Sequence, residues 1–276
     1  MRRPIALTIA GSDSSGGAGI QADLKTFSAF GVYGASVLTA LTAQNTTGVQ
    51  GVHPVPPAFV AAQIDSVLGD LDVRAAKTGM LADAPIIEAV VERLQRLQAR
   101  GRDIPLVVDP VMVATSGDVL LAPDAIETVR TRLIPRATVV TPNLPEAAQL
   151  LGEPVAATEA EIRDQLGRLS RLGAQAVLLK GGHGDGHDAT DYLSIGERVI
   201  ALTAPRIATR HTHGTGCTLS AAIAARLALG DDLETAVRRA KHYVHEAIAA
   251  GRDLGVGHGN GPVDHLYAMP APTPSK

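Results

Sequence analysis

The chain contains few of the residues on which several classes of protein depend. Its 276 residues include no tryptophan and one cysteine, Cys217, and aromatic residues make up 3% of the sequence. A single cysteine excludes both an intrachain disulfide and a cysteine-rich zinc site. The scarcity of aromatic side chains argues against a surface that stacks nucleic-acid bases.

Excess charge and long apolar runs are also missing. Lys and Arg total 25 and Asp and Glu total 28, which gives a net charge of −3 with His neutral. This balance argues against a nucleic-acid-binding face and against a polybasic membrane patch. No apolar run approaches the roughly 20 residues of a membrane span, and the run 5–10 is too short for a signal peptide. We therefore expect a soluble, cytoplasmic protein that acts on a small molecule.

Hydrophobic residues make up 45% of the chain, which is enough for a sizeable core. Short apolar runs alternate with amphipathic stretches. Several runs are apolar on both faces, as strands of a helix-covered parallel sheet are. The predicted strands are 5–10, 75–79, 105–109, 137–141 and 176–180. The predicted helices include 60–71, 87–94, 219–227 and 233–248, and one that opens with a capping box of Thr158 and Glu161.

Strands that alternate with helices predict an α/β fold with a mostly parallel central sheet. The runs 192–195 and 199–203 flank a short turn and predict an antiparallel hairpin late in the chain. We expect one domain over residues 1–269, with the proline-rich residues 270–276 as a loose tail. Ligands of such folds bind at the carboxyl ends of the strands.

A glycine-bearing loop leads into a helix of small residues at positions 213–222. Gly214 and Gly216, on either side of Thr215, would let the backbone approach a phosphate, and the helix N-terminus favours an anion. Cys217 would lie in the first turn, where we expect its pKa to fall below about 8.5. A thiolate there could accept the proton of an attacking alcohol. The alternative is a simple turn followed by an inert, buried cysteine.

Polar residues follow three of the predicted strands. Asp109 and Lys180 each end an apolar run, where a lysine can neutralise phosphate charge and an aspartate can orient metal-bound water. Asn143, Pro145 and Glu146 predict a helix N-terminus. Asn143 and Glu146 could also bind Mg²⁺ through its waters. The alternatives are that Asp109 only forms an Asp-Pro turn and that Lys180 is an exposed lysine at the end of a strand. Asn143 and Glu146 would then only cap the helix, without a metal.

Short segments spread over nearly the whole chain carry a further signal. They are 10–25, 39–46, 77–81, 109–112, 141–147, 180–183 and 212–218. In this order they resemble the hydroxymethylpyrimidine/phosphomethylpyrimidine kinases of thiamine biosynthesis, a family of the ribokinase-like superfamily. Sugar kinases of the superfamily typically carry Asp where this chain has Cys217, which favours the vitamin-kinase branch.

The resemblance implies a three-layer ribokinase-like sandwich, ATP and Mg²⁺ as cofactors, and a homodimer. The implied reaction is phosphorylation of 4-amino-5-hydroxymethyl-2-methylpyrimidine and then of its monophosphate. Catalysis would rest on the 214–217 loop, with Cys217 as general base, and on Lys180. Phosphate and metal would be handled by Asp109, Asn143 and Glu146.

The resemblance also implies a pocket for the pyrimidine. The amide of Gln44 can match both the ring nitrogen and the amino group of an aminopyrimidine edge. Without the family context, Gln44 would be interpreted as a surface residue and Asp23 as a solvated carboxylate. The residues that would line the pocket are Gly11, Asp23, Gln44, Met80, Val111 and His213.

Parts of the sequence also suggest other functions. Pyridoxal is also a flat heteroaromatic ring with a primary alcohol, so a pyridoxal kinase or a mixed specificity is the nearest alternative. A nucleotide-binding regulator without turnover is a second. Glycines 17 and 19 imitate a dinucleotide-binding fingerprint, but residues 35–60 lack the acidic residue that this motif requires. A transition-metal site on His211 and His213 is disfavoured because no second cysteine assists them.

Overall fold

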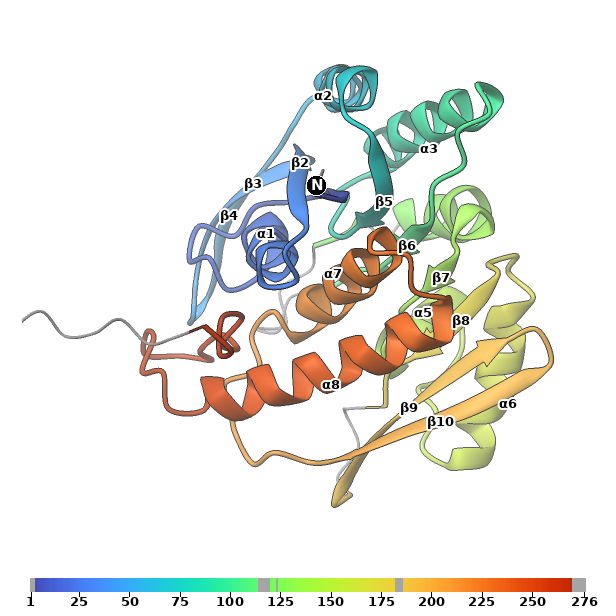
Figure 1. Cartoon of the computed structure of the whole chain (residues 1–276). Coiled ribbons are helices and arrows are strands. Elements are labelled where there is room, and N and C mark those ends of the chain that lie inside the picture. The colour runs from blue at the N-terminus through green and yellow to red at the C-terminus, as the bar shows by residue number, and fades with distance from the viewer. Residues whose placement is uncertain (1–2, 114–119, 123, 182–185, 270–276) are drawn as a thin grey trace, which may run out of the picture.

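Eight strands form one sheet in the part of the chain that the computed structural model describes, which is residues 3–113, 120–122, 124–181 and 186–269 (Figure 1). The strands are β1 (Ile5–Ala10), β2 (Tyr33–Leu38), β5 (Val73–Thr78), β6 (Leu106–Val108), β7 (Val139–Val140), β8 (Ala176–Leu179), β9 (Asp188–Ile195) and β10 (Arg198–Pro205). Their order is β10-β9-β8-β7-β6-β5-β1-β2. The predicted tail 270–276 lies outside the described residues.

Strands β1, β2 and β5 to β8 run parallel, whereas β9 and β10 continue the sheet as an antiparallel hairpin. The predicted late hairpin is therefore confirmed. Strands β6 and β8 are buried along their whole length, as their unbroken apolar sequences predict. Because the parallel strands point the same way, the residues that follow them collect at one edge of the sheet.

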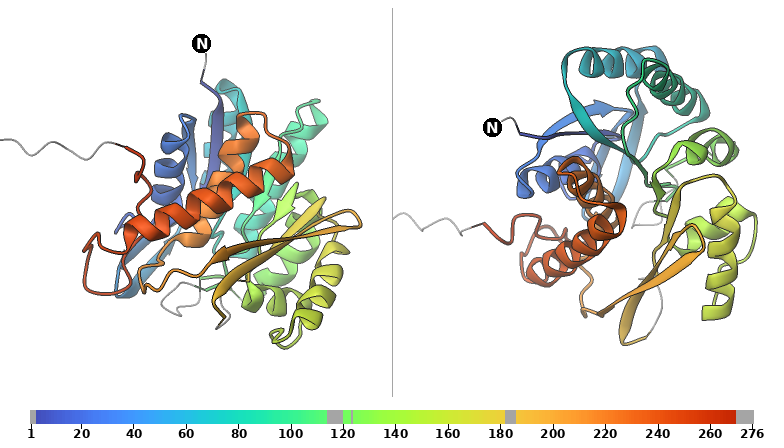
Figure 2. Two further views of the ribbon diagram at one scale, coloured as in Figure 1. Left: turned by 60° about the horizontal axis from the view of Figure 1, so that its bottom comes forward. Right: turned by 45° about the vertical axis from the view of Figure 1, so that its right-hand side comes forward.

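Helices cover both faces of the sheet. Helices α1 (Gly19–Ala29), α7 (Thr215–Ala228) and α8 (Leu233–Gly251) cover one face, and Figure 2 shows the orange and red pair α7 and α8 packed there. The opposite face is covered by α2 (Pro57–Asp70), α3 (Ala84–Ala99), α4 (Ala125–Thr128), α5 (Leu144–Leu151) and α6 (Glu159–Ser170). The predicted three-layer α/β architecture is confirmed.

Strand alternation divides the core between these two layers. Ala6 of β1 packs with Phe27 of α1, whereas Leu7 and Ile9 pack with Ile64 and other residues of the opposite layer. Successive side chains of a strand point to opposite faces, so one strand supplies both cores. A β-strand buried on both sides in this way is apolar except where a buried partner satisfies a polar side chain, as Asp23 does for Thr8.

Two capping boxes fix helices at the positions that the sequence predicts. Thr158 and Glu161 cap α6, and Asn143 and Glu146 cap α5, each with both reciprocal hydrogen bonds. Helix α4 was not predicted. It continues into a π-helical turn, η1 (Val129–Leu133), and a 3₁₀ turn, η2 (Ile134–Arg136).

A separate hairpin extends from the sheet beside β2. It consists of β3 (Ala40–Asn45) and β4 (Gly48–Pro54), which pair antiparallel (Figure 1). None of the predicted strands covers this hairpin, because its strands are polar, glycine-containing and largely exposed. The hairpin carries Gln44 over the carboxyl edge of the main sheet. Among the described residues, no helix combines the length and apolarity needed to cross a bilayer.

Candidate active site

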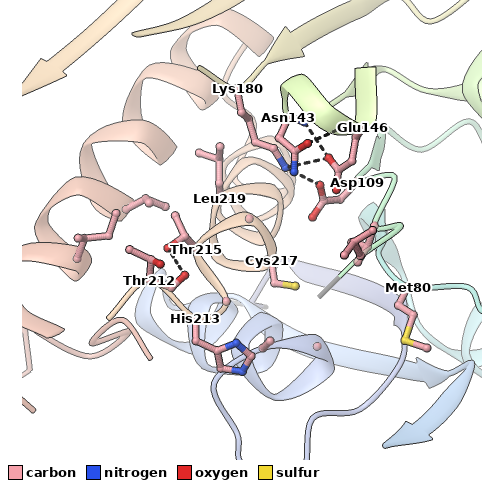
Figure 3. A pocket seen from close by; sticks show the side chains of 18 of the residues that line it. Met80, Asp109, Asn143, Glu146, Lys180, Thr212, His213, Thr215, Cys217 and Leu219 are labelled. Carbon is pink, nitrogen blue, oxygen red and sulfur yellow. Dashed lines mark hydrogen bonds and ion pairs between the residues drawn. The ribbon is translucent and has the colours of Figure 1, made fainter. Parts of the chain in front are cut away.

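A cavity of about 700 Å³ opens at the carboxyl edge of the parallel strands (Figure 3). Its walls come from the loops after β1, β5, β6, β7 and β8, from the β3–β4 hairpin, and from α7 and α8. All but one of the site residues expected from the sequence line it. These are Gly11, Gln44, Met80, Asp109, Val111, Asn143, Glu146, Lys180, His213, Gly214, Thr215, Gly216 and Cys217.

The N-terminus of α7 forms one wall of the cavity. Gly214 has φ 77° and precedes the helix, which begins without a side-chain cap. A methyl group on Gly214 would overlap the carbonyl oxygen of Gly17, and one on Gly216 would lie 3.4 Å from Lys180 Nζ. The two glycines thus leave the backbone open to the cavity at the helix start, and its N–H groups and dipole favour an anion.

Lys180 lies between two buried carboxylates. Its Nζ atom is 3.0 Å from Asp109 Oδ1 and 3.8 Å from Glu146 Oε2 (Figure 3). Thr141 Oγ1 donates to Asp109 Oδ1 at 3.0 Å, and Ser220 Oγ donates to Asp109 Oδ2 at 3.2 Å. Residues from three strand ends and from α7 therefore fix this cluster in place.

The charges of this cluster are not balanced. Burial opposes ionisation of Asp109, but the charges of Lys180 and Lys77 outweigh it and hold the pKa of Asp109 below its usual range. Burial raises the pKa of Glu146 to about 7, against the attraction of Lys180 and with added repulsion from Asp109. Burial would lower the pKa of Lys180, yet the two carboxylates raise it. Two carboxylates thus share one ammonium group, and a further cation would relieve their repulsion.

The donors of the cluster suit Mg²⁺, which prefers oxygen ligands and keeps several waters. Asn143 Oδ1 accepts from the Glu146 N–H and Glu146 Oε2 accepts from the Asn143 N–H, each at 2.8 Å. The cap is therefore present, and it holds Glu146 at the cavity wall. In the described part of the chain, no group of three His, Cys, Asp or Glu side chains could enclose a metal. This donor set fits an ion held largely through waters and phosphate oxygens.

Asp23 does not line the cavity, and the expectation that it does is wrong. Its side chain is fully buried on the inner face of α1, and both carboxylate oxygens lie 2.9 Å from Lys77 Nζ. Thr8 Oγ1 also donates to Asp23 at 2.6 Å. Lys77, which does line the cavity, comes between Asp23 and the ligand space. In the sequence, the sign of this pair is Lys77, a lysine within the predicted buried strand 75–79.

Cys217 faces the cavity in the first turn of α7, but its ionisation differs from the expectation. Burial raises the pKa of the Cys217 thiol to about 11, although Lys77 opposes this shift. The expected lowering by the helix N-terminus is therefore wrong, because the desolvation of a thiolate costs more than the nearby positive charge returns. Near neutral pH the group is a thiol.

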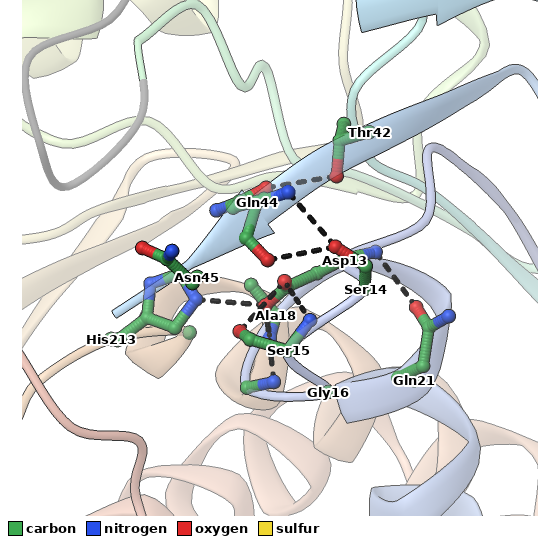
Figure 4. A network of polar contacts seen from close by, with 12 residues as sticks. Asp13, Ser14, Ser15, Gly16, Ala18, Gln21, Thr42, Gln44, Asn45 and His213 are labelled. Atoms are coloured by element: carbon green, nitrogen blue, oxygen red, sulfur yellow. Dashed lines mark hydrogen bonds and ion pairs between the residues drawn. The ribbon is translucent and has the colours of Figure 1, made fainter. Parts of the chain in front are cut away.

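Sequence analysis missed Asp13, which orients His213. His213 Nε2 lies 2.8 Å from Asp13 Oδ2 (Figure 4). Asp13 also accepts from the backbone N–H groups of Ser15, Gly17 and Ala18 at 2.8 to 3.0 Å. Burial opposes its ionisation, yet His213 and the hydroxyl and N–H groups of Ser15 lower the pKa of Asp13 to about 2. The pair joins the loop after β1 to the loop before α7.

Gln44 is held by its backbone. Ser14 Oγ donates to the Gln44 carbonyl at 2.7 Å and accepts from its N–H at 2.8 Å (Figure 4). Thr42 Oγ1 donates to Gln44 Oε1 at 3.2 Å. The amide nitrogen of Gln44 and the cavity walls of Met80 and Val111 thus form one end of the cavity.

The far end of the cavity could not be named from sequence. Ala204 and Pro205 at the end of β10, Ile207 just after it, and Val244 and Ile248 of α8 give it apolar walls. Lys241 Nζ donates to Asp191 at 2.8 Å, and Asp191 Oδ1 accepts from the Gly181 N–H at 3.0 Å. No local motif marks these residues, because segments distant in the sequence contribute them and most contacts are apolar.

This arrangement defines a kinase with a ribokinase-like fold, and comparisons with known proteins agree. The family model described as phosphomethylpyrimidine kinase matches residues 13–264. A hydroxymethylpyrimidine/phosphomethylpyrimidine kinase of Escherichia coli K12 is 54% identical over 268 residues, which are 97% of this chain and 99% of that protein. The chain belongs to the phosphomethylpyrimidine kinase family.

Solved structures resemble the chain closely. A Bacillus subtilis pyridoxal kinase in complex with ADP has a TM-score of 0.88 and 39% identity, covering 97% of this chain and 99% of that one. A phosphomethylpyrimidine kinase from Clostridium difficile 630 has a TM-score of 0.77 and 44% identity, covering 89% and 100%. The fold is therefore shared by kinases named for two different acceptors, pyridoxal and phosphomethylpyrimidine.

The placement of Asp23 leads to a test. Asp23→Asn leaves the buried Lys77 ammonium without its anion, so the free energy of unfolding should fall by about 3–5 kcal/mol in urea denaturation. The KM for the acceptor, measured in the cold where the variant is folded, should stay within about twofold of wild type. As a control, Asp65→Asn breaks the exposed pair with Arg93 and should cost less than about 1 kcal/mol. An unchanged free energy of unfolding together with a raised KM would contradict this placement and indicate that Asp23 lines the cavity.

Proposed function

We propose that this chain transfers the γ-phosphoryl group of ATP to 4-amino-5-hydroxymethyl-2-methylpyrimidine, and then to its monophosphate, in thiamine biosynthesis. One observation carries the proposal. A single cavity has an amide-bearing, apolar end at Gln44 and a phosphate-binding end at α7 and Lys180, with Cys217 between them. Membership of the phosphomethylpyrimidine kinase family supports the choice of acceptor.

The acceptor end suits a flat aminopyrimidine. The Gln44 amide offers a donor and an acceptor to the ring nitrogen and the amino group. Met80 and Val111 supply apolar contact to the ring faces. A methyl group on Gly11 would lie 3.0 Å from Met80 Sδ, so glycine at this position lets the thioether approach the ring.

The donor end suits the phosphates of ATP. The N–H groups at residues 214–217 would bind the equatorial oxygens of the transferred group, and Lys180 would neutralise their charge. Asp109, Glu146 and Asn143 would hold Mg²⁺ through its waters, and the ion would neutralise further phosphate charge. Phosphoryl transfer passes through a loose transition state, so catalysis here is mainly positioning and electrostatics.

The alcohol must also lose a proton, and we assign Cys217 as its acceptor. Only the thiolate can accept a proton, and a pKa of about 11 makes the thiolate a minor species at neutral pH. The monophosphate needs no such help, because its second pKa is about 6 and it reacts as an anion. The two transfers can thus share one anion site while differing in their need for Cys217.

The reaction is tested by counting the phosphates on the product. The enzyme, ATP and Mg²⁺ should convert the pyrimidine alcohol to the monophosphate and then to the diphosphate, followed by ³¹P NMR. A parallel reaction with pyridoxal tests the second candidate, which the structural likeness to pyridoxal kinases favours. Pyridoxal phosphate without any pyrimidine product would overturn the assignment of Gln44. ATP binding without turnover of either alcohol would indicate a regulator.

The role of Cys217 predicts a difference in pH dependence. Since its pKa is raised to about 11, the thiolate fraction grows with pH throughout the neutral range. The kcat for the alcohol should therefore rise about tenfold per pH unit from about pH 7 to about pH 10. The kcat for the monophosphate should stay nearly flat, and Cys217→Ala should abolish the rise for the alcohol. Parallel profiles for both acceptors in the wild type would contradict the assignment.

We also propose that this enzyme acts in the cytoplasm.

We further propose that the enzyme works as a homodimer. Four large apolar side chains support an interface between two copies. They lie on β2, on the β3–β4 hairpin and on α2, and are Tyr33 (56% exposed), Leu41 (46%), Val52 (41%) and Phe59 (62%). Exposed apolar side chains of this size are candidates for burial in a contact between two copies. Sedimentation equilibrium at twice the chain mass of 28.5 kDa is the expected result.

A further inference from the structure

The segment that follows α8 folds back against the tip of the β3–β4 hairpin (Figure 1). We call residues 257–262 the strap. The Asn260 N–H donates to the Thr46 carbonyl at 2.9 Å, and the Gly259 N–H donates to Thr46 Oγ1 at 3.2 Å. Thr46 is one of the two turn residues between β3 and β4, two residues after Gln44. The strap therefore holds the tip of the hairpin close to Gln44, the residue that faces the acceptor.

Glycines make this contact possible. A methyl group on Gly257 would overlap the Thr46 side chain, and one on Gly259 would overlap the Thr46 carbonyl oxygen. Gly257 also has φ 73°, whereas Gly259 is not in the left-handed region. Gly259 is thus required by the approach of the two backbones and not by its own conformation.

The other end of the strap is attached to the loop before α7. The Gly261 N–H donates to His211 Nδ1 at 2.9 Å, and the His213 N–H donates to the Gly261 carbonyl at 3.1 Å. A ring nitrogen that accepts carries no proton, so His211 is in the Nε2–H tautomer. This contact gives His211 a role that its sequence did not indicate.

The strap thus joins the two walls between which phosphoryl transfer takes place. Gln44 is held on one side by Ser14 and, two residues further along the chain, by the strap. His213, at the strap's other end, is held to the loop after β1 by Asp13. Displacing the hairpin tip would move the acceptor ring relative to the α7 N-terminus, and a misplacement of about 1 Å can cost a large factor in rate.

We propose that the strap positions the β3–β4 hairpin over the acceptor, which makes Thr46, Gly259 and His211 positioning residues for the acceptor and not for ATP. The proposal rests on the proposed function in that Gln44 contacts the acceptor. It adds residues from the C-terminal part of the chain to the determinants of acceptor binding.

The decisive variant is Gly259→Ala, whose methyl group would push the strap off Thr46. Its KM for the pyrimidine alcohol should rise about tenfold, whereas its KM for ATP should stay within about twofold. Hydrogen exchange without substrates should become faster at the amides of β3 and β4 and stay unchanged in the main sheet. Gly51→Ala is the matched control on the same hairpin, since its methyl group would lie 3.9 Å from Ala43 Cβ and should change neither readout.

Side-chain variants provide a second route that does not depend on the folding of Gly259→Ala. Thr46→Val keeps the shape but loses the acceptor for the Gly259 N–H, and Thr46→Ser restores it. His211→Leu removes the acceptor for the Gly261 N–H, and His211→Asn replaces it with a carbonyl oxygen. The Val and Leu variants should raise the acceptor KM, and the Ser and Asn variants should recover it.

The possible outcomes distinguish a failure of the strap proposal from a failure of the proposed function. Faster exchange of the hairpin with an unchanged acceptor KM would overturn the positioning role. A raised KM for ATP alone would also overturn it. If the wild type phosphorylates pyridoxal and not the pyrimidine, the proposed function fails, and the same KM comparison with pyridoxal still decides the strap.

Discussion

The site depends on two buried carboxylates that share one lysine. Asp109 and Lys180 follow β6 and β8, and Glu146 lies in the first turn of α5, which follows β7; the three strands are neighbours in the sheet. Burying such a set is costly unless each charge has a partner. Here the negative charge exceeds the positive, and burial raises the pKa of Glu146 to about 7, with added repulsion from Asp109. A cation and a phosphate chain would complete the set, so the cluster is built for a ligand that carries both.

The fold brings this cluster together by simple means. Parallel strands end at one edge, so residues spaced by about 35 positions in the sequence become neighbours there. The N-terminus of α7 faces the same edge because α7 packs on β5 and β6. Asp109 links the two, since it contacts both Lys180 and Ser220 of α7. The proposed phosphate-binding site thus follows from topology and a small number of glycines.

Local patterns were enough to predict much of this. The run of β1, apolar except for Thr8, and the capping residues of α5 and α6 were found where the sequence indicates them, because both signals are local. The strand-end residues Asp109 and Lys180 were found for the same reason. The roles assigned to them and to the other cavity residues stay predictions, because position alone does not test chemistry.

Several of the misses depend on long-range contacts. Asp23 pairs with Lys77 across 54 positions, and no local pattern distinguishes that carboxylate from one that contacts a ligand. The pKa of Cys217 depends on how deeply the helix start is buried, which spacing does not reveal. The hairpin lacks the apolar alternation of a buried strand, and the strap holds it through glycine backbone atoms. Acceptor specificity is therefore the part of the function least visible in the sequence.

The most direct test of the central claim is the Mg²⁺ requirement of Glu146→Gln. A glutamine keeps an oxygen to accept the Asn143 N–H, so α5 should stay capped, but the excess negative charge is gone. We expect the Mg²⁺ concentration for half-maximal activity to rise about tenfold while the KM for the pyrimidine is unchanged. An unchanged Mg²⁺ requirement would contradict the account, because the carboxylates would then have no part in holding the cation.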